Sequence, residues 1–203
     1  RFQQQFLNMY LQAHALPADS TIPPELNVAI IGAGATGVEL AAELHHASHE
    51  FARYGLDDIQ PQNVKITLIE AADRVLPVLP PQVSAEAEAQ LKAKGINVLT
   101  KTKVLSIQAH YVECEGGQRI PADLKVWSAG IKAPDFLQNI AGLETNRINQ
   151  LVVKPSLQTT RDNNIFAFGD CASCTLPHME RPVPPRAQTA HQQATYLVKA
   201  LAA

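Results

Sequence analysis

The sequence predicts an α/β fold with a doubly wound parallel sheet and an antiparallel β-meander. Strands alternating with helices predict the parallel sheet: an apolar run at 27–31 is followed by an Ala- and Glu-rich stretch over 37–53. A second strand at 64–70, a helix at 83–94 and a third strand at 96–99 continue this order. Because short turns cannot connect parallel strands, the helices are expected to form right-handed crossovers.

The antiparallel meander is predicted where the pattern changes to short β runs separated by tight turns. Its strands are expected at 103–108, 111–114, 118–120 and 124–129, with Gly116-Gly117 as one of the turns.

The two ends of the chain have patterns of their own. Apolar residues at 2–10 recur at near-helical spacing, and the prolines within 17–24 then break the helix. Towards the other end, strands at 151–154 and 165–168 precede a closing helix at 186–201. The chain is therefore divided into three parts, at 1–25, 26–132 and 133–203.

Composition and charge exclude several classes of protein. The 203 residues are 46% hydrophobic and 18% charged, which is typical of a globular protein with a buried core. A net charge of -2 without a basic cluster excludes nucleic acid as an expected partner. The longest apolar runs are far shorter than the roughly 18 residues of a membrane-spanning helix. Three cysteines make neither a disulfide framework nor a four-ligand zinc site, so we expect a cytoplasmic protein.

The loop Gly32-Ala33-Gly34-Ala35-Thr36-Gly37 predicts a Rossmann-like dinucleotide site, because it follows a strand and opens a helix. Gly32 permits the tight turn, Gly34 lets the backbone approach a pyrophosphate, and Gly37 lets helix and strand pack closely. The N–H groups at the start of the helix would face the anion. A glycine turn without a ligand is the alternative.

Glu70, at the end of the second strand, is the acid expected to bind an adenosine ribose. Its charge would repel a 2′-phosphate, which favours NAD(H) over NADP(H). More residues separate Glu70 from the glycine loop than the usual ~20. We attribute the difference to an insertion at 45–63. The alternative is a solvated strand-end Glu, with Arg74 able to accept a phosphate.

Further carboxylates stand at the predicted ends of helices and strands. Glu39 is expected in the first helical turn, where the dipole favours a negative charge. Glu43 follows at a like-charge spacing, so one of the two is expected to point into a site. Gly169-Asp170 follows the predicted strand at 165–168, at an edge where such sheets bind ligands. The alternative for Glu39 is a simple charge at the start of a helix, and the alternative for Asp170 is a capping residue.

Several other side chains have weaker signals. Gln188 and Gln192 fall on one face of the last helix, and their amides can bond a planar carbonyl compound, although solvated glutamines are common. Cys171 and Cys174 have the spacing of a redox pair, but nothing indicates an activated thiolate.

Histidines and the single tryptophan are interpreted as structural. His45 and His49 are spaced like two metal ligands on one helix face, but without a third ligand no metal site is predicted. Trp127 is expected in the core.

Four segments together resemble bacterial type II NADH:quinone oxidoreductases, which belong to the two-dinucleotide-binding-domain flavoproteins. The segment 31–44, IGAGATGVELAAEL, is shared across that superfamily. The segments 126–134, VWSAGIKAP, and 166–172, FAFGDCA, add to it. The segment 184–193, PPRAQTAHQQ, is more specific to the members that reduce quinones.

The resemblance implies NADH at the glycine loop, with Gly32, Gly34 and Gly37 around the pyrophosphate and Glu70 on the adenosine ribose. It implies that Glu39 lies near the contact of nicotinamide and flavin, and that Ala129-Gly130 passes close to the nicotinamide.

For the last part of the chain, the resemblance implies a partial FAD-binding domain. Gly169 and Asp170 would bind the flavin's ribityl or pyrophosphate part. Gln188 and Gln192 would line the quinone site beside the flavin ring. Members of this family pass a hydride from NADH to FAD and electrons on to a quinone, without pumping protons.

The sequence departs from that family in two respects, and the first is that it has only one glycine loop. The first glycine loop of the family, which binds the ADP part of FAD, and the C-terminal membrane-binding helices have no counterpart. We therefore expect a fragment: an NAD(H) domain at 26–132, preceded by a helix and linker from the FAD-domain side and followed by part of the FAD domain. FAD retention by this fragment is expected to be weak.

Two alternatives stay open at this point. One is a non-catalytic dinucleotide-binding module that senses redox state. The other is a related flavoprotein reductase with a different acceptor, such as a disulfide, a sulfide or a small electron-carrier protein. For the parent protein we expect attachment to the cytoplasmic face of the inner membrane, and the sequence is compatible with a homodimer.

Overall fold

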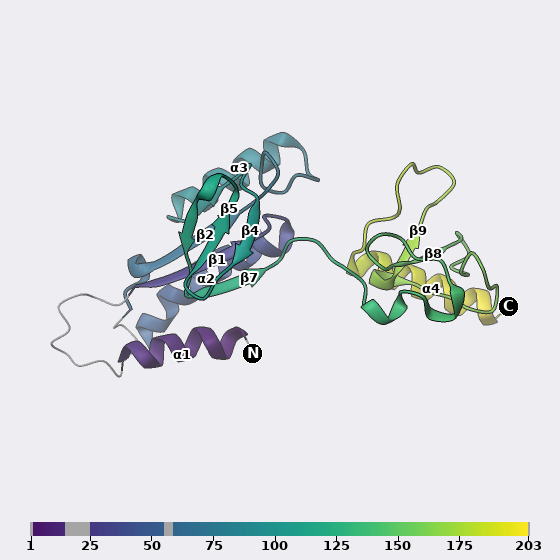
Figure 1. Ribbon diagram of the computed structural model, residues 1–203, viewed down its shortest axis with the longest axis horizontal. Coiled ribbons are helices and arrows are strands. Elements are labelled where there is room, and N and C mark those ends of the chain that lie inside the picture. Colours follow the sequence, from purple (N-terminus) through teal and green to yellow (C-terminus); the bar gives the residue numbers. More distant parts are fainter. Residues whose placement is uncertain (1, 15–24, 55–58, 203) are drawn as a thin grey trace. The chain divides into compact units, whose positions relative to one another are not determined.

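A computed structural model describes residues 2–14, 25–54 and 59–202, which form two compact units (Figure 1). The first unit ends at Ala129 and the second begins at Gly130. Each unit has a hydrophobic core of its own. In the described part of the chain, no helix has both the length and the apolar character needed to cross a membrane.

The first unit is built on a four-stranded parallel sheet. Its strands lie in the order β3-β2-β1-β7. They are β1 (Leu26–Ile31), β2 (Val64–Ile69), β3 (Asn97–Leu99) and β7 (Leu124–Trp127). Val28 and Ile30 of β1 pack in one core cluster with the helices, whereas Ala29 and Ile31 pack in another with the meander. Both faces of β1 are thus buried, which explains its uninterrupted apolar run.

The meander consists of three antiparallel strands, β4 (Val104–Ile107), β5 (Tyr111–Cys114) and β6 (Arg119–Pro121). The glycine turn between β5 and β6 is present, and Gly116 and Gly117 have φ values of 79° and 80°. The predicted α/β fold with a parallel and an antiparallel sheet is confirmed.

The assignment of residues 124–129 to the meander was wrong. Residues 124–127 form β7, which pairs in parallel with β1. The Asp123 carboxylate accepts a hydrogen bond from the Asn27 N–H at 2.8 Å, and the Asp123 N–H donates to the Asn27 carbonyl at 2.8 Å. These bonds place the start of β7 beside β1. Turn residues mark where a strand begins, but they do not specify its partner.

Two crossover helices cover one face of the parallel sheet. They are α2 (Ala35–Arg53) and α3 (Pro81–Ala93), each of which begins two residues earlier than predicted. A Schellman motif ends α3: the N–H of Ile96 donates to the Leu91 carbonyl at 3.1 Å, and the N–H of Gly95 to the Lys92 carbonyl at 2.9 Å. Gly95 has a φ of 77°, which this motif requires.

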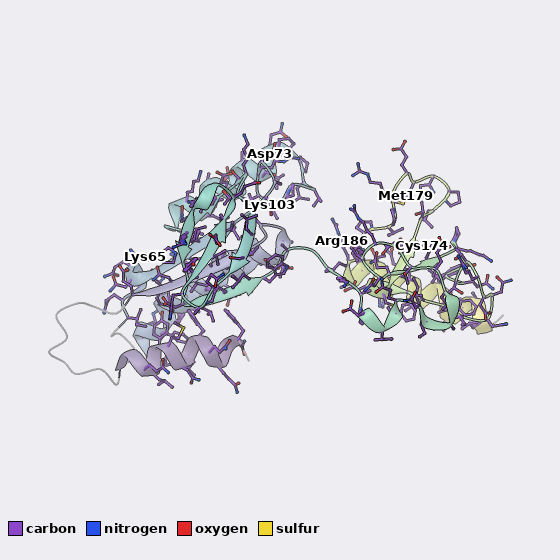
Figure 2. All side chains as sticks on the ribbon, in the orientation of Figure 1. Lys65, Asp73, Lys103, Cys174, Met179 and Arg186 are labelled. Carbon is purple, nitrogen blue, oxygen red and sulfur yellow. The ribbon has the colours of Figure 1, made fainter. Side chains whose placement is uncertain are left out.

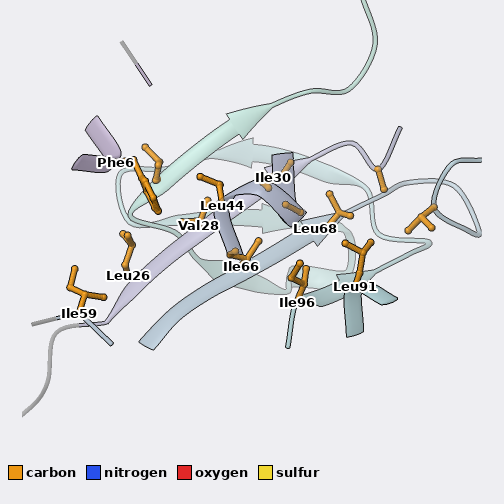
Figure 3. Close-up of a cluster of buried hydrophobic side chains, with 14 of the residues drawn as sticks. Phe6, Leu26, Val28, Ile30, Leu44, Ile59, Ile66, Leu68, Leu91 and Ile96 are labelled. Carbon is orange, nitrogen blue, oxygen red and sulfur yellow. The ribbon is translucent and has the colours of Figure 1, made fainter. Parts of the chain in front are cut away.

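The N-terminal helix α1 (Phe2–His14) packs into the core of the first unit. Its Phe6 and Tyr10 rings lie 5.7 and 4.7 Å from the ring of Phe51 on α2, measured between centroids. Phe6 appears in the same cluster as the buried residues of β1 and β2 (Figure 3). The predicted helix is confirmed, and the predicted break at 17–24 lies outside the described residues.

The second unit combines a short parallel strand pair with the C-terminal helix. The strands are β8 (Leu151–Val153) and β9 (Ala172–Cys174), and the helix is α4 (Ala187–Ala202). The strand predicted at 165–168 was wrong: this segment has only an isolated bridge between Gln158 and Phe166. Phe168 is 42% exposed, so the apolar run here is not that of a buried strand.

Candidate functional site

The turn between β1 and α2 is closely packed against the end of β7. Gly32 has a φ of 103°, and a Cβ atom on it would lie 2.6 Å from the backbone nitrogen of Ala129. A Cβ on Gly37 would overlap the carbonyl oxygen of Gly32 and lie 2.8 Å from the Ser128 hydroxyl. Only glycine fits at these two positions, as the sequence predicted.

Gly34, the middle glycine of the loop, has a different environment. A Cβ on Gly34 would have no atom within 4 Å in the described structure. The first helical hydrogen bond runs from the Val38 N–H to the Gly34 carbonyl at 3.0 Å, so the N–H groups of 34–37 precede the helical ladder. The turn therefore presents helix-terminal N–H groups beside open space, an arrangement that suits an anion.

Glu70 ties the glycine loop to the turn after β2. One carboxylate oxygen accepts the Ala33 N–H at 2.7 Å, and the other accepts the Ala72 N–H at 2.8 Å. This role was not predicted, since Glu70 was expected only to contact a ligand. Each oxygen retains acceptor capacity for a hydroxyl group.

A cavity of about 230 Å³ lies at the carboxyl ends of the parallel strands. Its lining residues include Gly32, Glu70, Thr102, Lys103, Trp127 and Ala129. Sequence reasoning missed Thr102 and Lys103 in the segment that follows β3, although the rule that ligands bind at the carboxyl ends of parallel strands points to this segment.

Trp127 was expected in the core, and this prediction was wrong. The side chain is 60% exposed, and its indole N–H donates to the Ala129 carbonyl at 2.7 Å. Arg74, considered as a phosphate ligand, does not belong to the lining described for this cavity. Its guanidinium donates instead to the Pro77 carbonyl at 2.9 Å.

Glu39 stands apart from these residues. Because α2 begins at Ala35, the first helical turn contains no acidic residue, and the argument from the helix dipole does not apply to Glu39. Its side chain is exposed, and it is absent from the lining of the cavity.

In the second unit, a tight turn precedes β9. Gly169 has a φ of 70°, and its N–H donates to the side-chain oxygen of Gln193 on α4 at 2.8 Å. The amide of Gln150 donates to the Asp170 carbonyl at 3.0 Å, while the Asp170 residue is exposed. The turn is thus fixed from two sides and leaves the Asp170 carboxylate at the surface. Gln193 was not predicted, because the sequence pattern on α4 pointed only to Gln188 and Gln192.

A largely apolar cavity of about 300 Å³ lies beside α4 in the same unit. The residues that line it include Leu157, Cys174, Leu176, Gln192, Gln193 and Tyr196. The structure therefore brings Gln192 and Gln193 to one cavity, whereas Gln188 lies outside this lining; Gln188 and Gln192 are both exposed.

Cys171 and Cys174, which have the spacing of a redox pair, form no disulfide in the structure. Both are free, and burial raises the pKa of the Cys174 thiol, which disfavours the reactive thiolate. The Cys171 thiol donates to the Phe168 carbonyl, with 3.2 Å between the heavy atoms. Within the described ranges, no three His, Cys, Asp or Glu side chains are grouped to hold a metal ion.

Comparison with known proteins identifies the family. The pyridine nucleotide-disulphide oxidoreductase family matches residues 5–194, and the chain belongs to it. A type II NADH:quinone oxidoreductase from Haemophilus influenzae is 43% identical over 98% of the chain, which covers 47% of that relative. One of the same name from Staphylococcus aureus is 32% identical over 86% of the chain and 43% of the relative.

The fold recurs in a solved structure, the covalent complex of putidaredoxin reductase with putidaredoxin. The TM-score is 0.70 at 30% identity, over 87% of this chain and 40% of the other. The chain thus spans less than half the length of the relatives it matches.

Gly37 and Gly34 provide a test of this geometry. We expect Gly37→Ala to reduce the free energy of unfolding by about 3 kcal/mol, since the new methyl group has no space. The matched change Gly34→Ala should alter it by about 0.5 kcal/mol or less, because its methyl group meets no atom. Chemical denaturation of both variants measures the difference. Equal losses would contradict the description of the loop.

Proposed function

We propose that the first unit binds NADH at the turn between β1 and α2. The open space at Gly34, beside helix-terminal N–H groups and the fixed Glu70 carboxylate, is the observation that carries this proposal. The pyrophosphate would accept hydrogen bonds from the N–H groups at 34–37, including those of Ala35 and Thr36. Membership of a pyridine nucleotide family supports the choice of ligand.

The remaining parts of NADH are assigned to the cavity around this turn. Glu70 would accept the adenosine ribose hydroxyls, and the exposed Trp127 offers an aromatic surface. Ala129 lies against Gly32, and with Gly130 it would border the nicotinamide. Glu39, whose side chain is exposed on α2, would lie near the nicotinamide.

We further propose that the second unit contributes to an FAD site. The Gly169 turn, held by Gln193 and Gln150, presents an exposed Asp170 carboxylate that can accept ribityl hydroxyls. A bound flavin would supply the hydride and electron transfer chemistry. The residues of the chain would orient it: backbone and carboxylate bind the polar tail, and the cavity beside α4 excludes water.

For the whole protein, we propose NADH:quinone oxidoreductase activity of the non-proton-pumping type. Both curated relatives described above carry that name. The cavity beside α4 fits a quinone, because its walls are mainly apolar and the Gln192 amide can bond a carbonyl oxygen. Gln188 lies one helical turn away on α4 and would border the same substrate. Because quinones are lipid-soluble, the proposal includes a site at the cytoplasmic membrane surface, and a homodimer stays a prediction.

A small electron-carrier protein is the second candidate for the acceptor. The likeness to a putidaredoxin reductase at 30% identity favours it. The higher identity to quinone reductases and the apolar cavity favour quinone.

The nucleotide preference tests the role of Glu70. We expect NADH to bind at least about tenfold more tightly than NADPH, because a 2′-phosphate would face the Glu70 carboxylate. Calorimetric titration with each nucleotide measures the ratio. Equal affinities would contradict the assignment of Glu70 to the ribose.

The acceptor site is tested in the whole protein by Gln192→Leu, which keeps the side-chain size but removes the amide. We expect a rise of about tenfold in the KM for quinone and unchanged NADH affinity, since one hydrogen bond to a carbonyl is lost. Steady-state kinetics with a water-soluble quinone measure both quantities, with Gln138→Leu as a control in the same unit. A variant with normal quinone kinetics would leave the electron-carrier protein as the better candidate.

A further inference from the structure

A second cavity of the first unit, of about 360 Å³, lies at the opposite end of β2 from Glu70. Its walls come from α2, the short 3₁₀ helix η1 (Pro61–Asn63), the start of β2 and the end of α3. At about 3.3 Å per residue, the six residues of β2 separate the two ends by roughly 20 Å. Lys65 accordingly lies at the other end of this unit from Asp73 and Lys103 (Figure 2). The proposed NADH site makes no use of this cavity.

The cavity is lined by basic side chains. His45, His49, Lys65 and Lys94 line it, and its described lining includes no Asp or Glu. The exposed Lys65 ammonium donates to the Gln62 carbonyl at 2.9 Å and keeps two donors for a ligand.

Carboxylates on the same helices form pairs of their own. On α2, Glu50 pairs with Arg53 at 2.9 Å, and on α3, Glu88 pairs with Lys92 at 2.6 Å. The negative partial charge at the C-terminal end of α3 is also reduced. Two of the last carbonyl groups of this helix already accept hydrogen bonds in the Schellman motif at Gly95. Among the described lining residues, no carboxylate compensates the positive charge of the cavity.

The two histidines of α2 are held in a fixed arrangement. Their ring centroids lie 4.5 Å apart, and the Nδ1 atom of His49 lies 2.8 Å from the His45 carbonyl oxygen. A carbonyl only accepts, so this Nδ1 carries a proton.

The pKa of His45 is lowered, first by burial and then by the charges of His49, Lys94 and His46. Lys65 also faces the cavity. A negatively charged ligand would relieve the repulsion between these positively charged side chains.

We propose that this cavity binds a small oxyanion with at least two negative charges, of the phosphate or phosphate-ester class. Its volume is in the range of small-molecule sites, two ammonium groups supply donors, and the two imidazole groups add donors when they are protonated. The two lysines make the histidine pair unsuitable as a cation site. Anion binding in this cavity is independent of NADH binding at the carboxyl ends of the parallel strands.

Titration with inorganic phosphate and pyrophosphate at constant ionic strength tests the proposal. Imidazole signals of His45 and His49 in NMR spectra should shift saturably, while those of His178 and His191 in the second unit stay unchanged. Affinity for pyrophosphate, which keeps at least two negative charges over this pH range, should rise as the pH falls through the pKa of His45, because the anion favours the protonated ring and raises that pKa. A shift that does not saturate, or one shared by all four histidines, would overturn the proposal.

Two lysines near the end of α3 give a matched pair of variants. Lys94→Gln removes a charge of the cavity, whereas Lys92→Gln removes the same charge from a side chain outside the described lining. We expect Lys94→Gln to weaken pyrophosphate binding about fivefold, Lys65→Gln/Lys94→Gln by about tenfold or more, and Lys92→Gln to leave it unchanged. Equal effects of Lys92→Gln and Lys94→Gln would show general charge attraction and overturn the proposal.

The variant Gly34→Ala separates this proposal from the NADH site. It should weaken NADH binding and leave the histidine shifts with pyrophosphate intact. Loss of those shifts in Gly34→Ala would place the anion at the glycine loop and contradict a second site. Intact histidine shifts in a chain that fails to bind NADH would instead refute only the NADH proposal.

Discussion

The close approach of Gly32 to Ala129 is the contact on which the site in the first unit depends. A side chain at Gly32 would push the turn away from β7, and one at Gly37 would push α2 away from the same turn. With both glycines in place, the end of β1, the start of α2 and the end of β7 meet at one point. The start of α2 then lies beside the cavity at the carboxyl ends of the strands, where N–H groups and a carboxylate can act on one ligand.

Glu70 combines a structural and an electrostatic role at this point. Its two hydrogen bonds to the backbone fix the carboxylate, so its negative charge has a defined position relative to the glycine loop. Lys103 lines the same cavity but is exposed, and a flexible, solvated ammonium loses more entropy on binding a phosphate. The fixed charge is therefore expected to dominate the choice between a ribose hydroxyl and a 2′-phosphate.

The parts of the molecule that depend on local sequence pattern were predictable, and those that depend on distant partners were not. The glycine loop, α2 and the Gly116-Gly117 turn follow from spacing and turn chemistry within a short window. The pairing of β7 with β1, the exposure of Trp127 and the bond from Gly169 to Gln193 depend on segments far apart in sequence. Such contacts leave no local signal in a single sequence.

Hydrogen exchange at the glycine loop tests the central claim most directly. The N–H groups of 34–37 precede the helical ladder, whereas the Ala33 N–H already donates to Glu70. Addition of NADH should slow exchange at 34–37 by about tenfold or more, and change Ala33 little, because the pyrophosphate becomes the missing acceptor. NADH that binds without slowing exchange at these four amides would contradict the account.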